Sequence, residues 1–210
     1  MSFSLVCNAD KINNDLLKSY DALPADPYIK DGMKRFRTFS YGEVKNGKVD
    51  WNATKPFFQS NEANSYAGGI KRSFQHTGEE AKKFAQAIVT DALEKEWVNA
   101  DHFFIGCHQI RVTADAKIVG YPAPEGFHHD ETDFIAINLI NEHNVNGAIS
   151  FISDFNDTSN ILFEKKLEPG QSLYVEDLKH KHYVSPFTPK LPNIETYRDI
   201  IGIAFYMNDR

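Results

Sequence analysis

The second half of the chain is a succession of short apolar segments, and this pattern restricts the fold more than any other feature. The segments begin at His102, are rich in Val, Ile, Phe and Tyr, and are separated by Gly, Asn, Asp or Pro. This is the composition expected of strands joined by turns. They are HFFIGCHQIRVTA, DFIAINLI, GAISFISDF, ILFEKKL, SLYVED, HYVSPF and DIIGIAFYM. Seven such strands predict a β-sandwich or jelly roll.

The first hundred residues supply helices that could cover such a sheet. Residues 79–97 place one apolar stripe at helical spacing, made of Ala81, Phe84, Ala85, Ile88, Val89 and Ala92. A shorter helix is expected in NADKINNDLLKSY, and RFRTFSYGEVKNGKVDW predicts a hairpin that turns at Asn46-Gly47. The expected fold class is α+β, mainly β, with the helices packed on one side.

The composition limits the compartment and the partners. With 210 residues, 41% hydrophobic content and no linker, we expect a single domain over 1–210. The net charge of −6 disfavours nucleic acid and anionic membranes as partners. No apolar run approaches the ~20 residues of a membrane span, and the N-terminus lacks the pattern of a signal peptide. Cys7 and Cys107 fit a reducing compartment, so a cytoplasmic location is expected.

The segment EGFHHDETDF contains two overlapping candidate metal-binding pairs, His128 with Asp130 and His129 with Glu131. If the next strand keeps register with the motif, the second pair shares a face with Ile135, Ile137 and Leu139. The first pair then shares a face with Phe134, Ala136 and Asn138. The side chains that line a working cavity should be smaller and more polar than those of a sealed core. This favours the pair of His128 and Asp130.

Two residues further along the chain could complete this site. His182 stands before a strand-like run, and Arg198 directly precedes the last apolar strand. Two histidines and one carboxylate form the facial triad of oxygen-activating non-haem Fe(II) enzymes. An arginine on a neighbouring strand can hold a carboxylate by two parallel hydrogen bonds. The order of these residues therefore predicts an iron site with a carboxylate clamp.

This order resembles the Fe(II)- and 2-oxoglutarate-dependent dioxygenases. More closely, LPADPYIKDGMKRFR, GGIKRSF, HQIRV, PEGFHHDETDF, LYVED and HYVSP…YRDIIGIAFY resemble the bacterial L-isoleucine 4-hydroxylase type, from about Leu23 to the C-terminus. The resemblance implies a double-stranded β-helix, a cupin-like jelly roll. It also implies that His128, Asp130 and His182 bind iron and that Arg198 binds 2-oxoglutarate. In one departure, Glu131 stands where a small residue usually follows the aspartate.

The activity that the resemblance implies is hydroxylation of an unactivated C–H bond of a free aliphatic L-amino acid, similar to isoleucine, leucine or methionine. Fe(II), 2-oxoglutarate and O2 are the implied cofactors, and succinate and CO2 the co-products. The charged ends of an amino acid need opposite charges, for which Arg111, Gln109 and Glu125 are the candidates. Two alternatives stay open: a metal-dependent cupin-type enzyme such as an isomerase, which does not use 2-oxoglutarate, and a non-catalytic binding domain.

Other polar residues have structural interpretations. Alternation in CHQIRVT places Gln109 and Arg111 on one strand face and His108 on the other, where we expect a core histidine. His180 is expected beside the site or at the surface. Arg35 and Arg37 are expected on a solvated strand face.

Overall fold

The computed structural model describes residues 2–30, 32–51 and 55–209. Its α-helices are α1 (Asn14–Ser19) and α2 (Glu79–Glu94), with 3-10 turns at Ala9–Lys11 and Tyr20–Ala22. Its strands are β1 (Phe3–Cys7), β2 (Lys34–Lys45), β3 (Lys48–Asp50), β4 (His102–Ala114), β5 (Phe134–His143), β6 (Val145–Gly147), β7 (Ile149–Asp154), β8 (Ile161–Lys166), β9 (Gln171–Val175), β10 (His180–Val184), β11 (Phe187–Pro189) and β12 (Thr196–Tyr206). None of the helices in these residues is long and apolar enough to cross a membrane.

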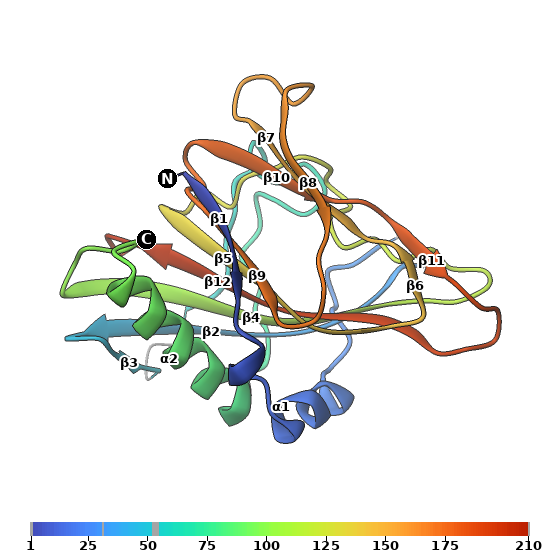
Figure 1. The fold of residues 1–210 in the computed structure, drawn as a ribbon, viewed down its shortest axis with the longest axis horizontal. Helices are drawn as coiled ribbons and strands as arrows, with labels where there is room; N and C mark the ends of the chain where they lie inside the picture. The colour runs from blue at the N-terminus through green and yellow to red at the C-terminus, as the bar shows by residue number, and fades with distance from the viewer. Residues whose placement is uncertain (1, 31, 52–54, 210) are drawn as a thin grey trace.

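The strands form antiparallel sheets of unequal size. The large sheet has the order β1-β9-β5-β12-β4-β2-β3, and a second sheet has the order β10-β7-β8. A further pair joins β6 to β11. Figure 1 shows the large sheet in the middle, with α1 and α2 below it and β7, β8 and β10 above it. The mainly β class with helices on one side is thereby confirmed, as are all seven strands expected after His102.

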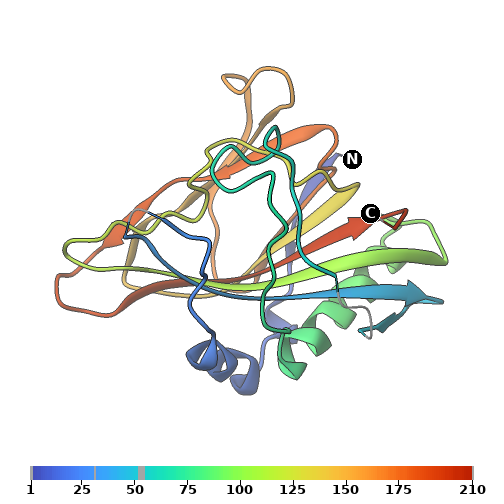
Figure 2. The same cartoon turned by 180° about the vertical axis from the view of Figure 1, so that it is seen from behind.

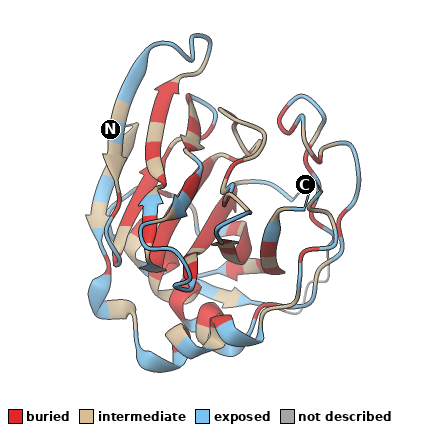
Figure 3. Cartoon of the chain, turned by 90° about the vertical axis from the view of Figure 1, so that its right-hand side faces the viewer, coloured by how far each residue is buried: buried red, intermediate tan, exposed pale blue. Residues whose placement is uncertain are grey.

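Each face of the large sheet packs against a different layer. The predicted stripe of α2 is buried against the lower face, where it meets residues such as Phe103 and Ile203. On the upper face, Ile137 and Leu173 pack with Ile152 of the smaller sheet. Figure 3 shows long buried stretches in the strands at the middle of the fold, whereas the connecting loops are largely exposed. One hydrophobic cluster therefore lies under the sheet, and another lies between the two sheets.

Local backbone conformation sets the ends of the predicted elements. The turn at Asn46-Gly47 has positive φ angles of 49° and 74°, as the hairpin between β2 and β3 requires. Helix α2 ends at Glu94, three residues before the predicted end at Trp97, because Glu96 adopts a left-handed φ of 56°. The N–H groups of Trp97 and Val98 then both donate to the carbonyl of Ala92.

A long connection between β3 and α2 contributes to the upper side of the sheet. We call residues 55–77 the cover segment. It has little regular structure, and a bridge between Phe57 and Arg72 joins its two limbs. In Figure 2 it is the turquoise chain that rises towards the smaller sheet and returns to α2. The cover segment thus connects the helical side of the fold with the side on which the histidines lie.

Candidate metal centre and its cavity

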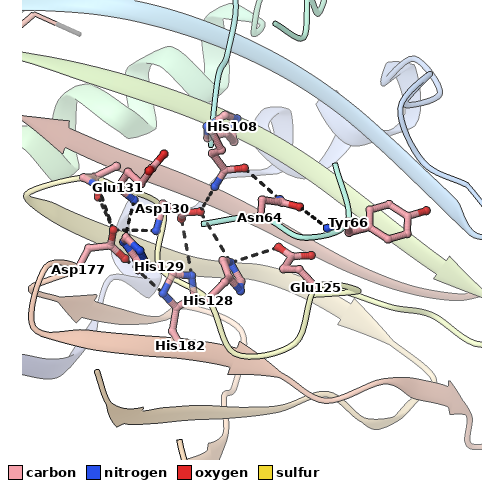
Figure 4. A network of polar contacts seen from close by, with 12 residues as sticks. Asn64, Tyr66, His108, Glu125, His128, His129, Asp130, Glu131, Asp177 and His182 are labelled. Atoms are coloured by element: carbon pink, nitrogen blue, oxygen red, sulfur yellow. Dashed lines mark hydrogen bonds and ion pairs between the residues drawn. The ribbon is translucent and has the colours of Figure 1, made fainter. Parts of the chain in front are cut away.

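Three predicted ligands converge at one end of the two sheets. His182 lies in β10, and a backbone bridge joins it to His128 through reciprocal N–H to carbonyl bonds of 3.1 and 2.8 Å. Possible ligand atoms of His128, Asp130 and His182 all lie within 4.8 Å of one another. The Nε2 atoms of both histidines are 3.7 Å from the Asp130 carboxylate (Figure 4). The predicted convergence is confirmed.

The rival pair lies outside this centre. The ring of His129 packs against Phe155, with ring centroids 4.9 Å apart, and the carboxylate of Glu131 accepts hydrogen bonds from Ser60. The strand register that was predicted between this motif and the next strand is nevertheless wrong. Ile135 and Ile137 line the cavity beside the triad, whereas Phe134 and Ala136 pack in the core below the sheet. The left-handed φ of 58° at Glu131 breaks the strand alternation before β5 begins.

Asp177 supports two of the three ligands and was missed by the sequence analysis. Its carboxylate has no exposed surface, and Oδ2 accepts the backbone N–H of Asp130 at 2.8 Å and of Thr132 at 3.0 Å. Its Oδ1 lies 3.5 Å from Nδ1 of His182. On the other histidine, Nδ1 of His128 is 2.9 Å from the carbonyl of Gly126. Both Nε2 atoms are therefore left to face the metal position.

The carboxylate of Asp130 is held by a residue of the cover segment. The amide of Gln59 donates to Oδ1 of Asp130 at 2.6 Å. Burial by itself would raise the pKa of Asp130, but the facing His182 and His128 and the nearby Arg37 outweigh it and lower the pKa below its usual range. Asp130 is consequently held as an anion, the state that binds a metal cation.

The triad opens into a cavity of about 910 Å³, a volume that includes solvent at its mouth, and Arg198 lines this cavity as well. The Arg198 side chain projects from β12 beside Val112 and is almost fully buried. Its Nε and Nη2 atoms have no hydrogen-bond partner among the described residues. Burial, only partly opposed by Glu142, lowers the pKa of this guanidinium to about 10, so it remains charged at neutral pH. A buried cation with open donors is suited to bind a carboxylate.

A second group of arginines lines the same cavity, contrary to the expectation of a solvated face. Arg35 and Arg37 are buried because β2 pairs with β4 beneath the cover segment. Arg35 donates to Asp26 at 2.8 Å, whereas neither Arg37 nor Arg72 forms an ion pair with a carboxylate of the described residues. Arg37 and Arg72 both lie over the ring of Phe57, at 4.9 and 4.5 Å. This wall of the cavity is strongly basic.

His108 belongs to this basic wall. It lies on the predicted strand face, where its ring stacks on Phe39 and its Nδ1 is 2.7 Å from Nη2 of Arg37. Burial first, and then the charges of Arg37, Arg72 and Arg35, lower the pKa of His108 well below its usual value. The neutral ring accepts a hydrogen bond from Arg37 and so fixes this guanidinium.

The three residues predicted to contact substrate fall in different places. Arg111 lies on the opposite face of β4, where Asp199 accepts two of its N–H groups at 2.7 and 2.8 Å. Gln109 shares that face and donates to Ser19 at 2.8 Å. Neither lines the cavity. Glu125 does, with its carboxylate 3.3 Å from Nε2 of His128. His180 packs edge-on against Phe3, outside the cavity.

The site combines a His-x-Asp…His facial triad with a buried arginine whose N–H groups are unpaired. On a jelly-roll fold, these features define a non-haem iron oxygenase. Residues 17–204 match the family described as 2OG-Fe dioxygenase, and the chain belongs to this family. It is therefore an enzyme that uses Fe(II) and 2-oxoglutarate, which rules out both alternatives left open by the sequence. The donor set fits these groups, since two imidazoles and a carboxylate suit Fe(II) and Arg198 offers unpaired donors to an anion.

Solved structures share the fold at low sequence identity. A bsmA homologue from Methylobium petroleophilum PM1 superposes with a TM-score of 0.80 at 19% identity, covering 99% of this chain and 89% of that one. IDO from Bacillus thuringiensis gives 0.74 at 20% identity, with 99% and 95% covered. The Fe(II)/α-ketoglutarate-dependent dioxygenase TqaL gives 0.71 at 16% identity, with 100% and 84% covered. No curated protein matches the chain.

Proposed function

We propose that this protein is a single-domain hydroxylase, over residues 1–210, that acts on a free L-amino acid with an aliphatic or thioether side chain. The observation that carries the proposal is the presence of the triad and the open guanidinium of Arg198 in one cavity. Because the triad and Arg198 line the same cavity, 2-oxoglutarate and a small substrate would lie in it together. The resemblance to the isoleucine 4-hydroxylase type supports the choice of amino acids.

In this proposal His128, Asp130 and His182 hold the iron. Bound iron and 2-oxoglutarate supply the O2-dependent oxidation of the substrate C–H bond, with release of succinate and CO2. Arg198 binds the far carboxylate of 2-oxoglutarate through its open N–H groups. The apolar side chains around it, including Val112 and Ile200, exclude water and strengthen that ion pair. Asp177 keeps His182 and the Asp130 backbone in position.

The residues that bind the charged ends of the substrate differ in part from those predicted from the sequence. Arg111 and Gln109 point away from the cavity, so we assign the substrate carboxylate to Arg37 and Arg72 on the basic wall. Glu125 keeps its predicted role and receives the ammonium group. Arg37 and Arg72 stack on Phe57, which limits their rotamers and lowers the entropy lost on binding a carboxylate. An amino acid held at both ends presents its side chain towards the triad.

The test is succinate formation with a panel of free L-amino acids, short peptides and DNA oligomers. We expect stimulation by branched or thioether amino acids and none by peptides or DNA. Arg37→Met and Glu125→Gln should each raise the KM for the amino acid by roughly 10- to 100-fold, because each leaves one charged end unpaired. Arg111→Met serves as the matched control and should leave this KM unchanged. Turnover with a peptide or DNA, and with no free amino acid, would overturn the proposal.

A further inference from the structure

Glu131 occupies a backbone conformation that a glutamate rarely adopts. Its φ of 58° lies in the left-handed region, where glycine and asparagine are favoured. Such a residue persists when its surroundings fix it, and it points to a role for the side chain. Glu131 also directly follows the triad residue Asp130.

The carboxylate of Glu131 fastens the cover segment to the metal-binding loop. Its Oε2 accepts the backbone N–H of Ser60 at 2.9 Å, and its Oε1 accepts the Ser60 hydroxyl at 2.7 Å. Hydrogen bonds to an ionised carboxylate are among the stronger ones in proteins. The neighbouring Gln59 bonds Asp130, so two consecutive residues of the cover segment contact two consecutive residues of the loop.

The same part of the cover segment positions the substrate side of the cavity. Asn64, Tyr66 and Arg72 line the cavity together with Gln59. The carbonyl oxygen of the Gln59 side chain accepts from Asn64 at 3.1 Å and from Arg72 at 2.6 Å. Gln59 therefore links the basic wall to Asp130. Any displacement of the cover segment at Ser60 would move Gln59, and with it the Arg72 guanidinium.

We infer that Glu131 is a positioning residue that latches the cover segment over the substrate side of the cavity. The latch holds Gln59 against Asp130 and Arg72 in the orientation that receives the substrate carboxylate. This inference rests on the proposed function for the identity of the substrate, but the latch itself is a property of the free protein. The metal site depends on it less, because Asp177 holds the backbone amide of Asp130 and only the Gln59 hydrogen bond to the Asp130 carboxylate would be weakened with the latch.

The decisive variant is Glu131→Gly, because glycine relieves the backbone strain while it removes the latch. Glu96 provides a matched control, since it is an exposed glutamate with a φ of 56° at the end of α2. Glu96→Gly makes the same substitution in the same backbone conformation, distant from the cavity in the fold. Ser60→Ala and Glu131→Gln retain part of the contact and should give intermediate effects. They also serve as substitutes if the glycine variant does not fold.

Three measurements compare these variants with the wild type. Hydrogen exchange in the cover segment should be faster in Glu131→Gly by about 10-fold or more, with the Ser60 amide as the direct reporter. The KM for the amino acid should rise about 10-fold or more, since Arg72 is no longer fixed. Anaerobic Fe(II) affinity, measured by competition with a chromophoric chelator, should fall by no more than about 10-fold, because only the Gln59 bond to the Asp130 carboxylate is weakened. Glu96→Gly should match the wild type in all three.

Several results would contradict the proposed role of Glu131 as a latch. One is exchange in Glu131→Gly as slow as in Glu96→Gly. Another is faster exchange with an unchanged KM, because the cover segment would then be held without positioning the substrate. A large loss of Fe(II) affinity would instead assign Glu131 to the metal site. If no amino acid stimulates the wild type, the proposed function fails, while the exchange comparison still tests the latch in the absence of substrate.

Discussion

The Nδ1 atom of His182 lies 3.5 Å from Oδ1 of Asp177, a carboxylate with no exposed surface whose other oxygen holds the backbone amides of Asp130 and Thr132. One buried side chain thus orients an imidazole and the backbone of the carboxylate ligand at the same time. Because β9 ends just before Asp177 and β10 begins just after it, the turn between these strands is part of the metal site.

Asp177→Asn should lower the affinity for Fe(II) by about 10- to 100-fold, the range seen when a partner of a metal-binding histidine is changed. The amide oxygen can still accept the two backbone N–H bonds, but the NH2 group would then face the imidazole N–H of His182. The measurement is an anaerobic Fe(II) titration. As a control, Glu176→Gln changes the adjacent carboxylate and should leave the affinity unchanged. Equal affinities in the wild type and Asp177→Asn would remove Asp177 from the site.

His128→Ala should abolish Fe(II) binding and turnover, whereas His129→Ala should leave iron bound. The two histidines are neighbours in the chain, but only His128 directs a ring nitrogen to the position shared with Asp130 and His182. The comparison uses the same Fe(II) titration together with succinate formation. A similar loss in both variants would count against this choice of ligands.

Arg198→Ala should raise the 2-oxoglutarate requirement roughly 30- to 1000-fold while Fe(II) binding is retained. The variant loses a charge-assisted contact in a dry part of the cavity, worth about 2–4 kcal/mol. The measurement is the concentration of 2-oxoglutarate that gives half-maximal succinate formation. Arg111→Ala is the control, because its guanidinium is paired with Asp199 on the opposite sheet face. An unchanged requirement in Arg198→Ala would make Arg198 a structural residue.

His108 should make the protein less stable in mild acid. Its folded-state pKa is depressed, chiefly by burial and then by Arg37, so below about pH 6.5 the unfolded chain binds a proton that the folded chain does not. The free energy of unfolding therefore falls as the pH falls. From pH 6.5 to 5, His108→Gln should lose about 1–2 kcal/mol less than the wild type in urea denaturation. Parallel pH profiles for the two proteins would contradict this assignment.

The sequence alone determined the features that follow from local periodicity. In β4, alternation correctly separated His108 from Gln109 and Arg111, because the side-chain period of a paired strand is fixed at two. The stripe of α2 and the turn at Asn46-Gly47 were predicted for similar reasons. The order of His128, Asp130, His182 and Arg198 indicated the chemistry, since these residue types are required by the metal and the anion.

Only the tertiary structure decided which residues surround that chemistry. Gln59 meets Asp130 across 71 positions of the chain, and Asp177 meets the same residue across 47, and no local pattern encodes such contacts. One left-handed residue, Glu131, reversed the register between the motif and β5. Burial of Arg37 likewise depends on the cover segment folding back over β2. Contacts of this kind arise when distant segments pack together, so their energies are set by the fold and not by neighbouring residues.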